Sequence, residues 1–196
     1  VGVAIGVALL PGLSRAVGSG DQAAAQSTMD EAIVLALALT LPAAAALTAM
    51  PFFLIDALFT RGEFHIYDAH QTASALLHYG GGVPAFVLAR VLAPAFFARH
   101  DTKGPMRFAL ISVAVNIALG VTLVRLFGFW GIAAATAFSA WLTVGQMAFA
   151  LARRGHYRPS AAAWSRVIRI ALASLVLGLL LALAAHFRPQ LEAPFA

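Results

Sequence analysis

One apolar stretch and the turn after it carry the side chains that could do chemistry. Arg90 lies within the apolar run that ends at Phe97, about 10 Å inside it by helical rise. Four more charged residues follow in the same segment, RVLAPAFFARHDTKGPMR: Arg99, Asp101, Lys103 and Arg107. A charge inside an apolar helix indicates a polar cavity or a ligand, unless a long side chain carries it to the lipid headgroups. Both interpretations of Arg90 stay open.

Among the uncharged polar residues of the later apolar stretches, three are considered for contacts between helices. Asn116 is the amide of the fourth stretch, and Thr136 and Ser139 lie in the fifth. Hydroxyl groups commonly donate to the backbone of their own helix, which accounts for the threonine and the serine. An amide surrounded by lipid needs a partner on another helix, so Asn116 predicts a contact between helices.

Enzyme chemistry has little support in the chain. The six histidines show no HExxH spacing, cysteine is absent, and no GxSxG motif places a nucleophile. We therefore expect no catalysis. Two alternatives of other classes stay open: a membrane enzyme, which should show acidic metal ligands or a His and Asp pair on a loop, and a noncatalytic scaffold, which the scarcity of extramembrane sequence disfavours.

The composition is that of a membrane protein. Apolar residues make up 61% of the chain and charged residues 11%, with a mean hydropathy of +0.86. Soluble domains are about 45 to 50% apolar and about a quarter charged. The net charge of +5 does not indicate nucleic-acid binding, because no dense basic face is interleaved with aromatic residues. The basic residues are better interpreted as a topology signal.

Six stretches are apolar enough to predict helices that cross a bilayer, which takes about 20 residues. They cover 1–17, 33–50, 67–97, 105–127, the run from the 128–131 turn to 151, and 164–187. Asp21 is the predicted N-cap of the second helix, and 51–59 is too short to span and is expected at the interface. The sequence thus predicts an all-α, polytopic transmembrane bundle.

The first stretch begins at Val1 within an apolar run, so we expect it to be truncated and the chain to be a fragment of a larger protein. The triplet Gly80 to Gly82 in the third stretch is explained either by close helix packing or by a hinge, and packing is favoured.

Basic residues are distributed unequally between the two sides of the predicted bundle. The side with three has Arg61, Arg125 and Arg188. The side with nine has Arg15, Arg99, Lys103, Arg107, Arg153, Arg154, Arg158, Arg166 and Arg169. Because cytoplasmic loops carry the excess of lysine and arginine, the connections near residues 18, 103 and 156 are predicted to face the cytoplasm.

Three motifs resemble those of the MurJ (MviN) family, the lipid II flippases of the multidrug/oligosaccharidyl-lipid/polysaccharide exporter superfamily. They are LLPGLSR at 9–15 with Gly20 and Asp21 after it, LFTRGEF at 58–64 with Asp68 beyond, and above all RVLAPAFFARHDTKGP at 90–105. The resemblance implies a fragment of a fourteen-helix transporter, from late in its eighth helix to its thirteenth. Residues 1–155 would form part of the C-terminal lobe, and 156–196 an additional peripheral helix and tail.

The resemblance also implies a function and a cargo. Such a carrier moves undecaprenyl-linked disaccharide pentapeptide (lipid II) from the inner to the outer leaflet of the bacterial inner membrane, by alternating access around a cationic cavity. Besides that cargo, its partners would be membrane lipids. The alternative is an exporter of another polyprenyl-linked glycan or of drugs. On this basis Arg90 is expected at the cavity or its mouth, and the hairpin of Arg99, Asp101, Lys103 and Arg107 at anionic headgroups or an inward gate.

Some members of that family bind sodium, and the resemblance places Asn116, Thr136 and the Ile132 backbone at the corresponding positions. Gly120 stands where an acidic or amide ligand would be expected. A sodium ion or the membrane potential would supply the driving force, and no other cofactor is expected.

Overall fold

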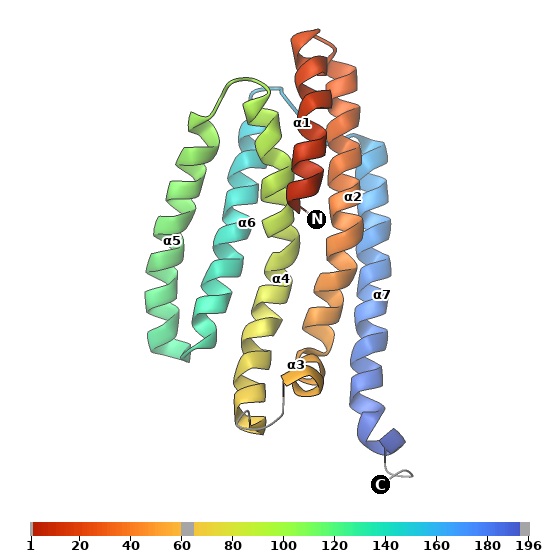
Figure 1. Ribbon diagram of the computed structural model, residues 1–196, viewed down its shortest axis with the longest axis vertical. Helices are drawn as coiled ribbons and strands as arrows, with labels where there is room; N and C mark the ends of the chain where they lie inside the picture. The colour runs from red at the N-terminus through yellow and green to blue at the C-terminus, as the bar shows by residue number, and fades with distance from the viewer. Residues whose placement is uncertain (1, 60–64, 193–196) are drawn as a thin grey trace.

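The computed structural model describes residues 2–59 and 65–192 of the chain. Within these ranges the backbone is helical and contains no strand (Figure 1). The helices are α1 (Gly2–Gly18), α2 (Gln22–Ala49), α3 (Pro51–Phe59), α4 (Ile66–Phe97), α5 (Lys103–Phe127), α6 (Trp130–Arg153) and α7 (Ala161–Glu192). The all-α prediction is confirmed.

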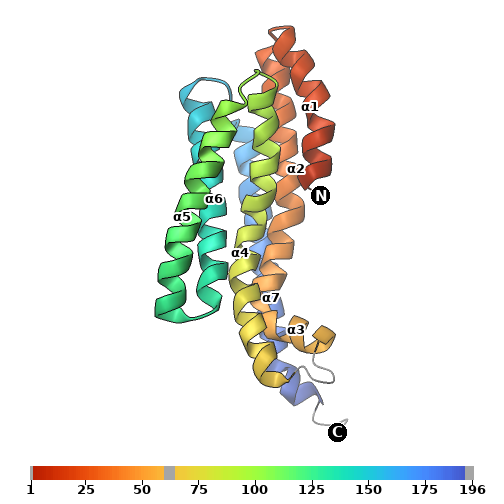
Figure 2. The same cartoon turned by 60° about the vertical axis from the view of Figure 1, so that its left-hand side comes forward.

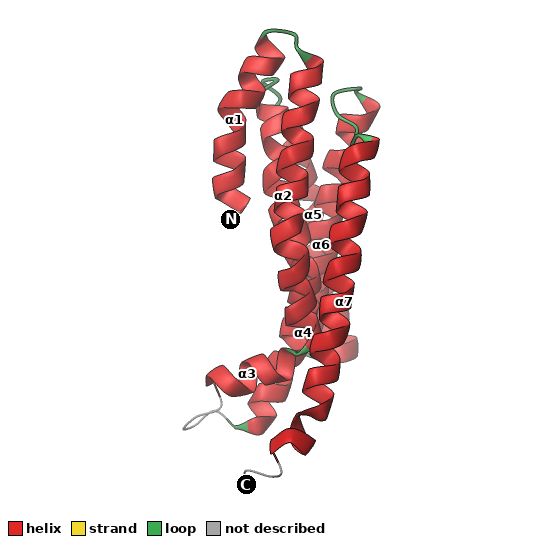
Figure 3. Ribbon diagram, turned by 90° about the vertical axis from the view of Figure 1, so that its right-hand side faces the viewer, coloured by secondary structure: helices red, strands yellow, loops and turns green. Residues whose placement is uncertain are grey.

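Five of the described helices, α2, α4, α5, α6 and α7, are long and apolar enough to cross a membrane. The remaining expected span, α1, has 17 residues and packs beside α2 and α4. The short helix α3 lies across the end of the bundle, as Figure 3 shows, in keeping with the predicted interfacial piece.

Local sequence signals account for several helix ends. The Asp21 carboxylate accepts a hydrogen bond from the Ala24 backbone N–H at 2.9 Å, which is the predicted N-cap of α2. Gly128 ends α5 with a φ of 81°, a conformation that a side chain disfavours, and α6 begins two residues later. The predicted tight turn between these two helices is therefore present.

Helix α4 is central to the packing of the bundle. It packs against α1, α2, α3 and α6, whereas α5 packs mainly on α6, and α7 mainly on α2 (Figure 2). The largest fully buried side chains come from four helices, α4 itself and its neighbours α1, α2 and α6: Phe96, Leu13, Met29, Leu151 and Val91. Helices α5 and α7 consequently expose most of their apolar surface, as lipid-facing helices do.

The division of the chain into a lobe of residues 1–155 and a peripheral part of residues 156–196 stays a prediction.

Close packing explains the glycine triplet in α4. A Cβ on Gly80 would lie 3.0 Å from the Leu47 Cβ atom, and one on Gly82 would lie 3.1 Å from the Ala137 Cα atom. These two glycines let α2 and α6 approach α4 from different sides. Helix α4 continues through the triplet without interruption, so the packing interpretation is supported.

The predicted grouping of basic connections is confirmed. The connections α1–α2, α4–α5 and α6–α7 lie together at the upper end of the bundle in Figure 1, and the α5–α6 turn lies at the other end. We call these the basic end and the opposite end. Arg61, and with it most of the LFTRGEF motif, lies outside the described residues.

Candidate functional site

A polar pocket forms where α4 and α5 both pack on α6 but hardly on each other. Its volume is about 370 Å³. It brings together Arg90 of α4, Asn116 of α5 and Thr136 of α6, which the sequence had indicated separately. The full lining is Phe86, Ala89, Arg90, Ala109, Ser112, Val113, Asn116, Thr136, Ser139, Ala140 and Thr143.

Arg90 supplies the charge of this pocket. Its side chain is exposed, and it makes no hydrogen bond or ion pair with any residue in the described ranges. The lining contains no carboxylate, so the pocket carries one positive charge without a protein counter-ion. The same side chain also borders an apolar hollow beside Gly2 and Gly6 of α1. Its Cδ atom would lie 3.4 Å from a Cβ on Gly2, so the stem of the side chain runs beside α1. Both interpretations of Arg90 therefore stay predictions.

The hydroxyl groups of α6 donate as predicted. Thr136 Oγ1 donates to the Ile132 carbonyl at 2.9 Å, and Ser139 Oγ donates to the Thr136 carbonyl at 3.0 Å. These bonds satisfy the hydroxyl protons and leave the oxygen lone pairs as acceptors.

The helix-to-helix bond expected from Asn116 is made one turn earlier in α5. Among the described residues Asn116 has no hydrogen-bond partner, whereas the Thr143 hydroxyl donates to Ser112 Oγ at 2.7 Å and joins α6 to α5. That expectation was wrong because the partly buried Asn116 amide borders the open pocket, where it remains free to bind a ligand. Ser112 and Thr143 were missed. Their positions, four residues from Asn116 and Ser139, were the signal, since this spacing shares a helix face.

Two of the three residues implied for sodium line the pocket. Asn116 and Thr136 line the pocket, but Ile132 does not, and its carbonyl already accepts from Thr136. Gly120 provides no side-chain oxygen. The pocket therefore offers sodium two neutral side-chain oxygens at these positions and a neighbouring guanidinium, which repels a cation.

The four charged residues of the hairpin after α4 fall into two groups: Arg99 and Asp101 have partners on another connection, whereas Lys103 and Arg107, among the residues described, do not. The carboxylate of Asp101 forms an ion pair with Arg154 at 2.5 Å, and the Arg99 guanidinium donates to the Ala95 carbonyl at 2.8 Å and to the His156 carbonyl at 3.3 Å. These two residues therefore bind the α4–α5 connection to the α6–α7 connection. Lys103 and Arg107 are exposed and have no such partner in the described ranges.

This contact shifts the pKa values of two groups outside the spans. The hydrogen bond from Arg154, followed by the backbone N–H of Gly104, holds the pKa of the Asp101 carboxyl below its usual value. Partial burial, and after it the charges of Arg99 and Arg154, lower the pKa of the His156 imidazole.

A second polar contact at the basic end was not predicted. The Tyr157 hydroxyl donates to Asp30 Oδ1 at 2.6 Å, and the Ser160 backbone N–H lies 3.4 and 3.3 Å from the two oxygens of the same carboxylate. Burial, with the Asp30 hydrogen bond, raises the pKa of Tyr157 above its ordinary range. Asp30 thus holds the start of α7 on α2. An acidic residue in the polar first part of α2 was the available signal.

These features define a multi-pass α-helical membrane protein with a cationic, polar pocket between its spanning helices. The family model described as "Lipid II flippase MurJ" matches residues 1–192, and the chain belongs to this family. The resemblance of the three motifs is therefore confirmed.

Relatives agree with this assignment, and a solved structure shares the fold. The chain is 44% identical over 156 residues to a probable lipid II flippase MurJ of Rhizobium tropici, covering 80% of this chain and 29% of the relative. It is 38% identical over 177 residues to that of Rhizobium meliloti, covering 90% and 33%. A structure of a lipid II flippase MurJ in an inward closed conformation matches with a TM-score of 0.74 at 20% identity, over 97% of this chain and 44% of that one. The chain spans about a third of the length of the curated relatives it matches.

Proposed function

We propose that this chain forms part of a lipid II flippase of the bacterial inner membrane, which moves undecaprenyl-linked disaccharide pentapeptide to the outer leaflet by alternating access. Family membership over residues 1–192 is the observation that carries the proposal. The cationic pocket of α4, α5 and α6 supports it, because a pyrophosphate and sugars need polar partners while they cross hydrocarbon.

The pocket residues suit noncovalent recognition of such a cargo. The Arg90 guanidinium is a planar fork that can donate two hydrogen bonds to phosphate oxygens. The Asn116 amide can both donate and accept, and the hydroxyl oxygens of α6 can accept from sugar or peptide groups. No bond of the cargo has to form or break, so we propose a transporter without catalysis.

The function is tested with Arg90 in the natural full-length protein. Cells that depend on an Arg90→Gln variant should accumulate lipid II in the inner leaflet, with a transport rate reduced about tenfold, since a charged hydrogen bond contributes about 1.5 to 3 kcal/mol. Arg125→Gln, at the exposed opposite end of α5, is the matched control and should transport normally. Unchanged lipid II with build-up of another polyprenyl-linked glycan would instead identify an exporter of that glycan.

We further propose that Asn116 and Thr136 contact cargo and do not coordinate sodium, which leaves the membrane potential as the driving force. The purified protein should then show the same melting temperature in sodium and in potassium chloride of equal ionic strength. A stabilisation specific to sodium that Thr136→Val abolishes would contradict this assignment.

For the hairpin, we propose that Lys103 and Arg107 meet anionic headgroups and that Arg99 and Asp101 brace the lobe. Retention of phosphatidylglycerol by the delipidated protein in detergent, measured by native mass spectrometry, should weaken in the Lys103→Gln, Arg107→Gln variant, by about 1 kcal/mol for each charge removed. Equal binding by the variant and the parent protein would reject the headgroup contact.

A further inference from the structure

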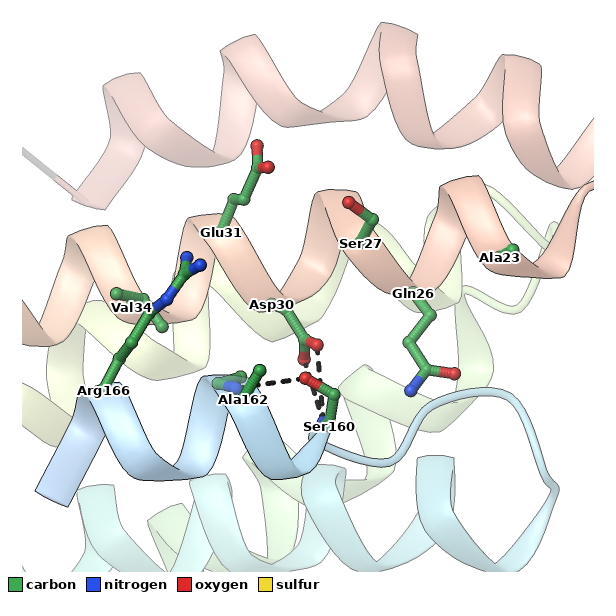
Figure 4. Close-up of a pocket in the computed structure, with 10 residues that line it drawn as sticks. Ala23, Gln26, Ser27, Asp30, Glu31, Val34, Ser160, Ala162 and Arg166 are labelled. Carbon is green, nitrogen blue, oxygen red and sulfur yellow. Dashed lines mark hydrogen bonds between the residues drawn. The ribbon is translucent and has the colours of Figure 1, made fainter.

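A second pocket lies on the basic end, away from Arg90, between the first turns of α2 and the start of α7. Its volume is about 410 Å³. Figure 4 shows its polar residues. Gln26, Ser27, Asp30 and Glu31 belong to α2, Arg166 belongs to α7, and Ser160 is the residue just before α7 begins. None of its lining residues also lines the pocket of Arg90, Asn116 and Thr136.

The depth of this pocket matches the headgroup layer of a bilayer. On α2 it ends at Val34, where the apolar part of the helix begins, and on α7 it ends at Arg166, five residues after the helix starts. Beyond it both helices continue as long apolar segments. A molecule in this pocket would therefore place its head among polar groups and its tail along apolar surface.

The charges inside the pocket are not equally available to a ligand. Asp30 is committed to Tyr157 and to the Ser160 backbone, and Figure 4 shows its carboxylate directed at Ser160. Glu31 and Arg166 are both exposed, and neither makes a hydrogen bond or an ion pair within the described part of the chain. One free carboxylate and one free guanidinium thus remain, on facing helices. The guanidinium reaches from α7 across toward α2 (Figure 4).

We propose that this pocket binds a zwitterionic phosphoethanolamine lipid, with its phosphate on Arg166 and its ammonium on Glu31. A purely anionic headgroup would have to lie beside Glu31 and Asp30, and a purely cationic one would lie beside Arg166, so both are disfavoured by charge. A primary ammonium donates three hydrogen bonds, which suits Glu31 and the Ser27 hydroxyl, whereas a choline headgroup has no N–H to donate. The bound lipid would join α7 to α2 beside the Asp30 contact.

The proposal is tested on the natural full-length protein, delipidated in detergent, by native mass spectrometry and by melting temperature. Phosphatidylethanolamine should be retained better and should raise the melting temperature more than phosphatidylcholine or phosphatidylglycerol. Arg166→Gln should weaken retention of phosphatidylethanolamine about two- to fivefold, the range of a partly exposed ion pair. Glu31→Gln should remove the preference for ethanolamine over choline. Arg169→Gln, three residues further along α7 and outside the pocket lining, should bind as the parent protein does.

Three results would overturn the proposal. One is equal retention of phosphatidylglycerol and phosphatidylethanolamine by the parent protein. Another is unchanged retention in both pocket variants with a lipid-free melting temperature equal to that of the parent. The last is equal stabilisation by water-soluble glycerophosphoethanolamine, which would indicate a headgroup site that does not need the lipid. None of these measurements depends on lipid II transport, so the site and the proposed function fail separately.

Discussion

The two ends of the bundle are held together by different physical interactions. At the basic end, charged and polar side chains cross between connections that are far apart in the chain: Asp101 to Arg154, Arg99 to the His156 carbonyl, and Tyr157 to Asp30. At the opposite end rings stack. Phe52 lies 4.2 Å from His70, and Trp130 lies 4.8 Å from His78 and 5.2 Å from Phe127, measured between ring centroids.

This difference has consequences for how each end responds to perturbation. Ring packing and close backbone approach depend mainly on shape and hardly on salt. Ion pairs and charged hydrogen bonds are directional, depend on protonation and weaken as salt screens them. Steric changes should therefore act most strongly at the opposite end, and changes of charge or ionic strength at the basic end.

The largest effect is expected from Gly131→Ala, at the α5–α6 turn of the opposite end. A Cβ on Gly131 would lie 2.6 Å from the backbone of Leu123, so the helices must separate, at a cost of about 2 kcal/mol. Gly145→Ala in the same helix meets nothing within 4 Å and should gain up to about 1 kcal/mol from helix propensity. Unfolding in detergent, followed by tryptophan fluorescence, measures both. Equal stabilities would show that the turn tolerates separation.

The next effect is expected from Asp30→Ala at the basic end. It leaves the buried Tyr157 hydroxyl without its acceptor and should cost about 1 to 3 kcal/mol. Adding Tyr157→Phe removes the stranded hydroxyl and should recover part of that loss. Urea unfolding of the two variants and the parent protein measures the difference. No recovery in the double variant would mean that Asp30 acts mainly through the Ser160 N–H.

A smaller effect is expected from Arg154→Gln, because the Asp101 ion pair is partly exposed. Its side chains are 45% and 26% exposed, so the loss should stay below about 1 kcal/mol and shrink further at high salt. Arg153→Gln is the neighbouring control, since Arg153 is exposed and has no ion pair among the described residues. Melting temperatures at low and high salt provide the test. A loss that does not depend on salt would show that Arg154 acts through packing over Phe96 instead.

The smallest effect is the pH dependence contributed by His156. The folded-state pKa of His156 lies below the ordinary value of 6.5, so folding favours the neutral ring. Its contribution to stability is present above pH 6.5 and is lost as pH falls through that value toward the folded-state pKa. Because the ring is partly exposed, the loss should be below about 0.5 kcal/mol.

Melting temperatures measured from about pH 7.5 to about pH 5.5 should fall for the parent protein and less for His156→Asn. His100→Asn serves as the control, since His100 lies in the adjacent connection with a left-handed φ of 56°, which asparagine also adopts. A steeper fall in His156→Asn than in the parent protein would reverse the assignment.

The helices and the grouping of the basic connections were predictable because their signals are local. Apolar length marked the spans, Asp21 and Gly128 marked ends, and the inequality of basic residues placed three connections at one end. The three motifs identified the family for the same reason, since a motif is a contiguous run of residues.

The sites could be located only in the tertiary structure. When all helices are similarly hydrophobic, the sequence does not indicate which of them pack against each other. Only the packing of α4 and α5 on α6 brings Arg90 and Asn116 to one pocket, and it transfers the helix-to-helix bond from Asn116 to Ser112. Likewise, Asp30 and Tyr157 are 127 residues apart, and nothing local joins them. What the chain determined by itself is which segments are apolar enough to meet lipid, since each residue contributes its transfer free energy wherever it lies. What only the fold decided is which polar groups meet, because hydrogen bonds and ion pairs form only at short distance and in the right direction.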